Sequence, residues 1–119
     1  MSLLEKIKRK AVGKNEDSPV FQRAMAEKIN GKKVRYVTER VDGDETVLGR
    51  DGVITLRGSE LILSCREVRR GEEDVLFRGT AGEVKISELM SLDGVILSGA
   101  DAAHQGIIRT VVAYYKYYR

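Results

Sequence analysis

The sequence predicts a mainly β, α+β fold: a small antiparallel β-roll or barrel of six to eight strands with one packed N-terminal helix. Short apolar and β-branched runs, separated by glycine, fill the chain after residue 32. The clearest example is residues 52–65, where two such runs meet at Gly58. A helical pattern at residues 18–31 precedes them. The 119 residues are enough for one domain that buries roughly two-thirds of its unfolded surface.

The helix is predicted from its ends. Ser18 suits the N-cap, Pro19 suits the first helical position, and Gly31 follows as a stop signal. The apolar face between them is expected to pack on the sheet or to close one end of the barrel, with a role in partner binding as the alternative. This face consists of Val20, Phe21, Ala24, Met25 and Ile29.

Strands follow from the alternating pattern. They are expected at residues 33–41, 45–48, 52–57, 59–66, 75–78, 84–86 and 107–118. Asp42-Gly43 predicts a two-residue turn, Asp51-Gly52 and Asp93-Gly94 are interpreted as one turn chemistry used twice, and residues 87–90 as a helical turn. The last run also fits a helical face, but its five β-branched residues and four tyrosines favour a strand.

The positive charge lies in the N-terminal segment. The chain carries a net +3, but residues 1–14 alone carry +4, so the remaining 105 residues sum to −1. We expect residues 1–17 to be a mobile basic segment and linker, and residues 18–119 to be the single domain. An amphipathic helix in the segment predicts contact with an anionic membrane surface or a protein partner, and a frayed or loosely docked terminus is the alternative. The contact residues are Leu3, Leu4, Lys6, Ile7, Lys8, Arg9 and Lys10.

An aromatic and basic cluster ends the chain. Tyrosines interleaved with a cation can stack on single-stranded nucleic acid, although tyrosines on a terminal strand also cover a core or a subunit contact. The candidate nucleic-acid residues are Tyr114, Tyr115, Lys116, Tyr117 and Tyr118.

Residues able to carry catalysis are few. His104, the only histidine, follows Asp101 by three positions, so the two side chains can orient one another for acid–base chemistry, against the alternative of a plain surface loop. Cys65, the only cysteine, shares the apolar parity of its strand and predicts a core residue. The arginines and carboxylates of residues 66–74 predict a self-neutralised loop, with an anion site as the alternative. No metal, cofactor or small-molecule substrate is expected.

Two resemblances add to this interpretation. The strand pair Gly52 to Cys65 resembles bacterial pleckstrin-homology-like or GRAM-type domains, in which a strand beginning with Gly, a Thr, a turn and a second apolar strand recur. That resemblance implies a curved antiparallel roll that binds lipids or proteins without catalysis. A leading helix before a small bent barrel also looks like an Sm-like arrangement, which implies RNA binding.

The sequence therefore predicts a non-catalytic, cytoplasmic binding or assembly module. Its partner is expected to be a protein, including a second copy of the chain, or an anionic membrane surface. An RNA-binding small barrel that uses the tyrosine strand is the alternative. An enzyme centred on Asp101 and His104 is the third hypothesis.

Overall fold

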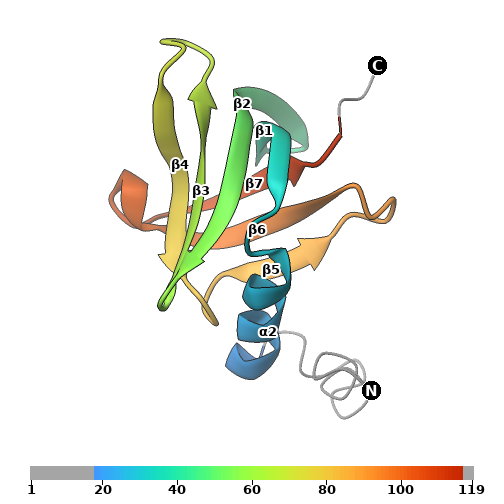
Figure 1. The fold of residues 1–119 in the computed structure, drawn as a ribbon. Helices are drawn as coiled ribbons and strands as arrows, with labels where there is room; N and C mark the ends of the chain where they lie inside the picture. The colour runs from blue at the N-terminus through green and yellow to red at the C-terminus, as the bar shows by residue number, and fades with distance from the viewer. Residues whose placement is uncertain (1–17, 117–119) are drawn as a thin grey trace.

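The computed structural model describes residues 18–116, and within them seven strands form one antiparallel sheet (Figure 1). The strand order is β4-β3-β2-β1-β7-β6-β5. The sheet curls until β4 packs on β6 and on the short helix η1, so the predicted mainly β roll with one helix is confirmed. The elements are α2 (Pro19–Ile29), β1 (Lys33–Val41), β2 (Asp44–Arg57), β3 (Glu60–Glu67), β4 (Glu73–Thr80), β5 (Lys85–Glu88), β6 (Gly94–Asp101), η1 (Ala102–His104) and β7 (Ile107–Tyr114).

Helix α2 closes one end of the curled sheet, far from the β3–β4 turn (Figure 1). Ser18 Oγ accepts a hydrogen bond from the Phe21 N–H at 3.1 Å, which confirms the predicted N-cap. After the helix, the Gly31 N–H donates to the Ile54 carbonyl at 2.8 Å, and Asn30 Oδ1 accepts from the Leu56 N–H at 2.8 Å. The end of the helix is therefore joined by hydrogen bonds to the last residues of β2.

The predicted helix face needs one correction. Val20 is 66% exposed, whereas Gln22, expected outside this face, is buried. Gln22 Oε1 accepts a hydrogen bond of 2.7 Å from the Ile86 N–H of β5. Because β5 is an edge strand, this N–H has no strand partner, and the glutamine satisfies it. The buried helix face thus combines this polar contact with the predicted apolar residues Phe21, Met25 and Ile29.

Strand β2 is one long strand where two were expected. Asp51 has a φ of +53°, and the register with β3 shifts between Arg50 and Val53, so Asp51-Gly52 forms a bulge rather than a turn. A Cβ atom on Gly52 would lie 2.1 Å from the Ser64 carbonyl oxygen. The second Asp-Gly pair has the same requirement, because a Cβ on Gly94 would lie 2.4 Å from the Ala113 carbonyl oxygen. The two pairs therefore share close strand approach and not turn chemistry.

Two further expectations concern the second half of the chain. The predicted strand at residues 107–118 forms over Ile107–Tyr114 and ends before residues 115–116, and residues 117–119 lie outside the described residues. The helical turn expected at residues 87–90 is wrong, since Ser87 and Glu88 complete β5 and pair with β6. Within the described residues no helix is long and apolar enough to cross a membrane.

The core lies between the concave face of the sheet and α2. Its largest fully buried side chains include Phe77, Ile54 and Leu97. Cys65 is fully buried among them, which confirms its predicted place. Burial, followed by the neighbouring carboxylates of Glu73, Asp51 and Asp74, raises the pKa of the Cys65 thiol to about 12. The thiol therefore acts as a small core group, protonated at neutral pH.

We predict that Gly52→Ala lowers the free energy of unfolding by about 2 kcal/mol, because the new methyl group overlaps the β3 backbone. Gly58→Ala is the matched control, since Gly58 has a φ of +62° but no atom within 4 Å of its Cβ position. The control should cost about 1 kcal/mol, from the positive φ alone. Urea denaturation measures both, and equal or reversed losses would contradict the steric account of Gly52.

Candidate functional site

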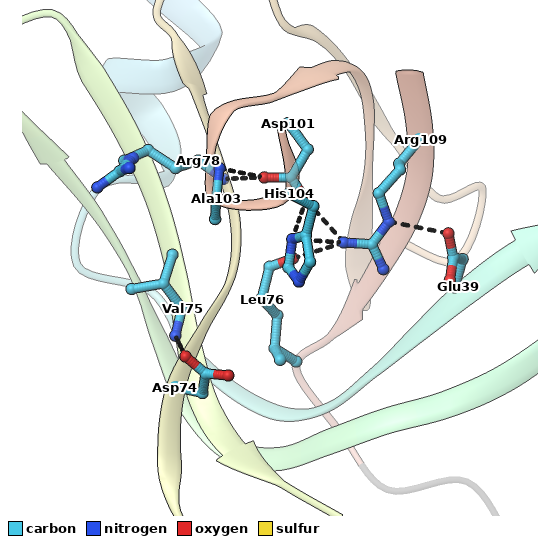
Figure 2. A network of polar contacts seen from close by, with 9 residues as sticks. All are labelled: Glu39, Asp74, Val75, Leu76, Arg78, Asp101, Ala103, His104 and Arg109. Atoms are coloured by element: carbon cyan, nitrogen blue, oxygen red, sulfur yellow. Dashed lines mark hydrogen bonds and ion pairs between the residues drawn. The ribbon is translucent and has the colours of Figure 1, made fainter. Parts of the chain in front are cut away.

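Asp101, at the end of β6, is a fully buried carboxylate that accepts four hydrogen bonds (Figure 2). Its Oδ1 atom accepts from the backbone N–H of Arg78 at 3.0 Å and of Ala103 at 2.9 Å. Its Oδ2 atom accepts from Arg109 Nη1 at 2.6 Å and contacts His104 Nδ1 at 2.7 Å. One carboxylate thus joins β4, η1 and β7.

Arg109 extends the cluster across the sheet. Its Nε donates to Glu39 Oε2 on β1 at 2.9 Å, and its Nη1 donates to the Leu76 carbonyl on β4 at 3.0 Å. The arginine side chain is only 11% exposed. Because β4 is an edge strand, Asp101 and Arg109 together satisfy edge groups at Arg78 and Leu76 that have no strand partner.

The cluster stays ionised at neutral pH. Burial by itself raises the pKa of Asp101, but hydrogen bonds from Arg109, the Arg78 backbone, His104 and the Ala103 backbone outweigh it and hold this pKa below its usual value. The hydrogen bond from Arg109 likewise lowers the pKa of Glu39. The guanidinium pKa is raised in turn, chiefly by its bond to Glu39. The result is one buried cation between two carboxylates.

The geometry also indicates which ring nitrogen of His104 carries a proton. Its Nδ1 lies 2.7 Å from Asp101 Oδ2 and 3.1 Å from Arg109 Nη1. An arginine nitrogen can only donate, so the shorter contact to the carboxylate places a proton on Nδ1. In the neutral ring Nε2 is then an acceptor. The imidazole is 42% exposed and lines a cleft, so the sequence-predicted Asp–His contact exists, but with a buried Asp101 rather than a surface loop.

This cleft has a volume of about 490 Å³ and opens to solvent. One side is formed by residues 46–48 of β2, and another by residues 67–70 at the β3–β4 turn. Asp74 and Leu76 of β4 contribute the remaining wall, with His104 and Arg109 beside them. The cleft therefore combines aliphatic surface with several charged groups.

The carboxylates of the cleft are already in use. Glu67 accepts from the backbone N–H groups of Arg69 and Arg70 at 2.9 and 3.0 Å, and these bonds, the Arg69 bond foremost, lower its pKa. Asp74 accepts from the Val75 N–H at 2.8 Å and from Arg70 at 3.4 Å. Among residues 18–116, the Arg69 guanidinium has no hydrogen-bond or ion-pair partner. The predicted self-neutralised loop thus holds for Arg70, whereas the side chains of Arg66 and Arg69 have no ion-pair partner among the described residues.

The described part of the tyrosine cluster is divided between separate surroundings. Tyr114 stacks on Tyr36 with ring centroids 4.4 Å apart and donates its hydroxyl proton to Glu45 at 2.6 Å. Burial, and then the bond to Glu45, raises the pKa of Tyr114 to about 12. A carboxylate therefore lies beside the tyrosine that was expected to stack on a base.

The neighbouring residues of that cluster point elsewhere. Tyr115 packs against the core, with Lys32 Nζ 5.6 Å from its ring centroid. Lys116 pairs with Asp93 at 3.1 Å. Tyr117 and Tyr118 lie outside the described residues, as do the predicted N-terminal contact residues. These are Leu3, Leu4, Lys6, Ile7, Lys8, Arg9 and Lys10.

Sequence reasoning missed Glu39 and Arg109, and it included Arg69 only in the alternative anion site of residues 66–74. Arg109 did leave a signal, because it occupies an inward position of an apolar strand, in step with Val111 and Ala113. A charge at such a position needs a buried partner. The identity of that partner, 70 residues away in Glu39, depends on the strand order.

Comparisons with known proteins add no relative: no family model, no curated protein and no solved structure matches this chain. The resemblances to pleckstrin-homology-like or GRAM-type domains and to Sm-like barrels therefore stay predictions. Across the part of the chain that the structure describes, no three His, Cys, Asp or Glu side chains gather as metal ligands.

We predict that Asp101→Asn lowers the free energy of unfolding at pH 7 by about 3 kcal/mol, because an amide nitrogen would face the Arg109 and His104 donors and leave a buried cation underpaired. Asp44→Asn is the control, since Asp44 is exposed at the start of β2. Urea denaturation should show a small effect for the control. An equal effect of both variants would contradict a central role for Asp101.

The stability difference between the wild type and Asp101→Asn should also depend on pH. The folded-state pKa of Asp101 is lowered, so its stabilisation is present above the unfolded value of about 3.9 and is lost as the pH falls through the folded value. The stability difference between the wild type and Asp101→Asn should therefore shrink in acid below about pH 4. A difference that stays constant into that range would contradict this electrostatic origin.

Proposed function

We propose that this protein is a non-catalytic binding module that holds an acidic segment of a protein partner in the cleft beside His104 and Arg109. The observation that supports the proposal most directly is the imbalance of the cleft. Its carboxylates are occupied by internal donors, while the Arg69 guanidinium has no partner among the described residues. A ligand carboxylate supplies the missing acceptor.

The aliphatic surface narrows the ligand class further. Val47 is 38% exposed and Val68 is 45% exposed, and both line the cleft together with Arg69. Apolar contact beside a charge-assisted hydrogen bond suits a carboxylate that is carried next to an apolar side chain. Peptide segments with alternating acidic and apolar residues have this composition, and polyanions such as RNA do not.

Binding is better supported than catalysis. Asp101 orients His104 as in an acid–base pair, but the charge of this carboxylate is shared with Arg109. Thr46 carries the only hydroxyl group among the residues that line the cleft, and none of them carries a thiol. No activated nucleophile therefore accompanies the imidazole. We further propose a cytoplasmic location, which the single, buried and unpaired Cys65 supports.

We predict that the probe acetyl-Glu-Val-Glu-Val-Glu-Val-amide binds in this cleft. In ¹H–¹⁵N spectra of the labelled protein, the amide signals of residues 46–48 and 67–70 should shift on titration. Arg69→Glu should weaken binding about tenfold, because it removes one charge-assisted contact and adds a repulsive one. Arg57→Glu is the control, as it makes the same charge change at the far end of β2.

A comparison of an acidic with a basic probe tests whether the cleft recognises negative charge. A probe with lysine in place of each glutamate should bind more weakly than the acidic probe, and added salt should weaken the acidic probe. Equal binding of the two probes, or equal losses for Arg57→Glu and Arg69→Glu, would exclude specific recognition of acid by the cleft.

A further inference from the structure

The first residues of β2 have a partner strand on one side only. Residues 44–47 pair with β1, whereas pairing of β2 with β3 begins at Gly49 opposite Glu67. Between residues 18 and 116, no strand pairs with the other edge of residues 44–47, and all four residues are exposed. Thr46 and Val47 on this edge also line the cleft beside Arg69.

The turn before β2 determines which backbone groups face the open edge. Asp42 and Gly43 have φ values of +50° and +85° and form a two-residue turn, so Val41 and Asp44 are the hydrogen-bonded pair that closes the hairpin. In an antiparallel pair, the hydrogen-bonded residues alternate. The N–H and C=O groups of Glu45 and Val47 therefore point away from β1, toward the open edge.

At the two outer edges of the sheet, β4 and β5, side chains bind backbone groups that have no strand partner. On β4, the Arg78 N–H and the Leu76 carbonyl are bound by Asp101 and Arg109. On β5, the Ile86 N–H is bound by the buried Gln22. Side chains thus occupy both outer edges at these positions, as is usual where strand addition would be harmful. The edge at residues 44–47 has no such side-chain cap in the described structure.

We infer that the partner segment binds as an added β-strand along residues 44–47, an inference that rests on the proposed function. Its backbone would exchange hydrogen bonds with Glu45 and Val47, and every second side chain would lie on the cleft side of the sheet. Acidic residues at those positions bring carboxylates to the side occupied by Arg69. The backbone supplies affinity, and the Arg69 guanidinium selects the sequence.

A second copy of the chain fits this edge less well than an acidic peptide. The matching edge of another molecule carries Glu45, but its Oε1 already accepts hydrogen bonds from Thr38 at 2.5 Å and Tyr114 at 2.6 Å. Edge-to-edge pairing of two copies would also bring their Arg69 side chains into the same region. Charge complementarity therefore favours an acidic segment of a different protein.

Val47→Pro tests the backbone contact. The N–H of Val47 points away from β1, so proline removes a donor from the open edge without breaking the β1–β2 ladder. The acidic hexapeptide should bind this variant about tenfold more weakly. Val47→Ala keeps the N–H and loses only the apolar contact that both variants lose, so it should bind about threefold more weakly than the wild type. Equal losses for both variants would overturn strand addition, and far-ultraviolet circular dichroism checks that each is folded.

Two N-methylated probes give an independent answer. One carries N-methyl groups on all three valines and the other on all three glutamates. Only alternate residues of an added strand donate to the edge, so one probe should bind like the parent peptide and the other should lose binding. Equal binding of all three peptides, with Arg69→Glu still harmful, overturns strand addition while leaving the proposed function intact. Failure of the unmodified acidic probe removes both.

Sedimentation velocity without peptide tests the competing occupant. The wild type and Val47→Pro are expected to sediment alike across a wide range of protein concentration. A dimer that forms in the wild type and disappears in Val47→Pro would assign the edge to a second copy and overturn the peptide proposal.

Discussion

The fold depends on the hydrogen bonds that the buried carboxylate of Asp101 accepts from the Arg78 N–H of β4 and from Arg109 of β7. The sheet order separates β4 from β7 by three strands, yet the curl of the sheet brings them close enough for Asp101 and Arg109 to bridge them. The sheet is therefore closed by side-chain hydrogen bonds and not by a backbone ladder between β4 and the opposite strands. The neutral amide of Gln22 joins α2 to β5 in a similar way. The molecule is therefore a barrel closed by polar side chains, and breaking one of these contacts leaves buried polar groups without partners.

The same constraint shapes the cleft. Arg109 forms ion pairs with both Glu39 and Asp101, so its charge is neutralised inside the protein. Its guanidinium also lines the cleft. Glu67 is likewise committed to the turn of residues 69–70. Of the three arginines that line the cleft, Arg69 alone has no hydrogen-bond or ion-pair partner among the described residues. The contacts that stabilise the fold thus leave in the cleft the cation that the proposed function uses.

Local signals were enough to predict the helix and the first hairpin, whereas contacts between distant residues determine the site. Ser18, Pro19 and Gly31 marked the helix, and Asp42-Gly43 marked the first hairpin, because caps and tight turns depend on neighbouring residues alone. Asp51-Gly52 shows where such reasoning fails. Its glycine is needed for space against Ser64, a residue of the adjacent strand, and the local sequence does not distinguish that need from a turn.

The charge of Arg69 affects which strands can pair with the open edge at residues 44–47. An uncapped edge invites pairing with any exposed strand, including that of a second copy, and proteins commonly deter this with a charged side chain near the edge. In the proposed mode of binding, Arg69, on the opposite wall of the cleft, would oppose a second copy by like-charge repulsion and attract an acidic strand. On this proposal, one guanidinium without a partner among the described residues both protects the edge from self-association and selects the ligand that the edge accepts.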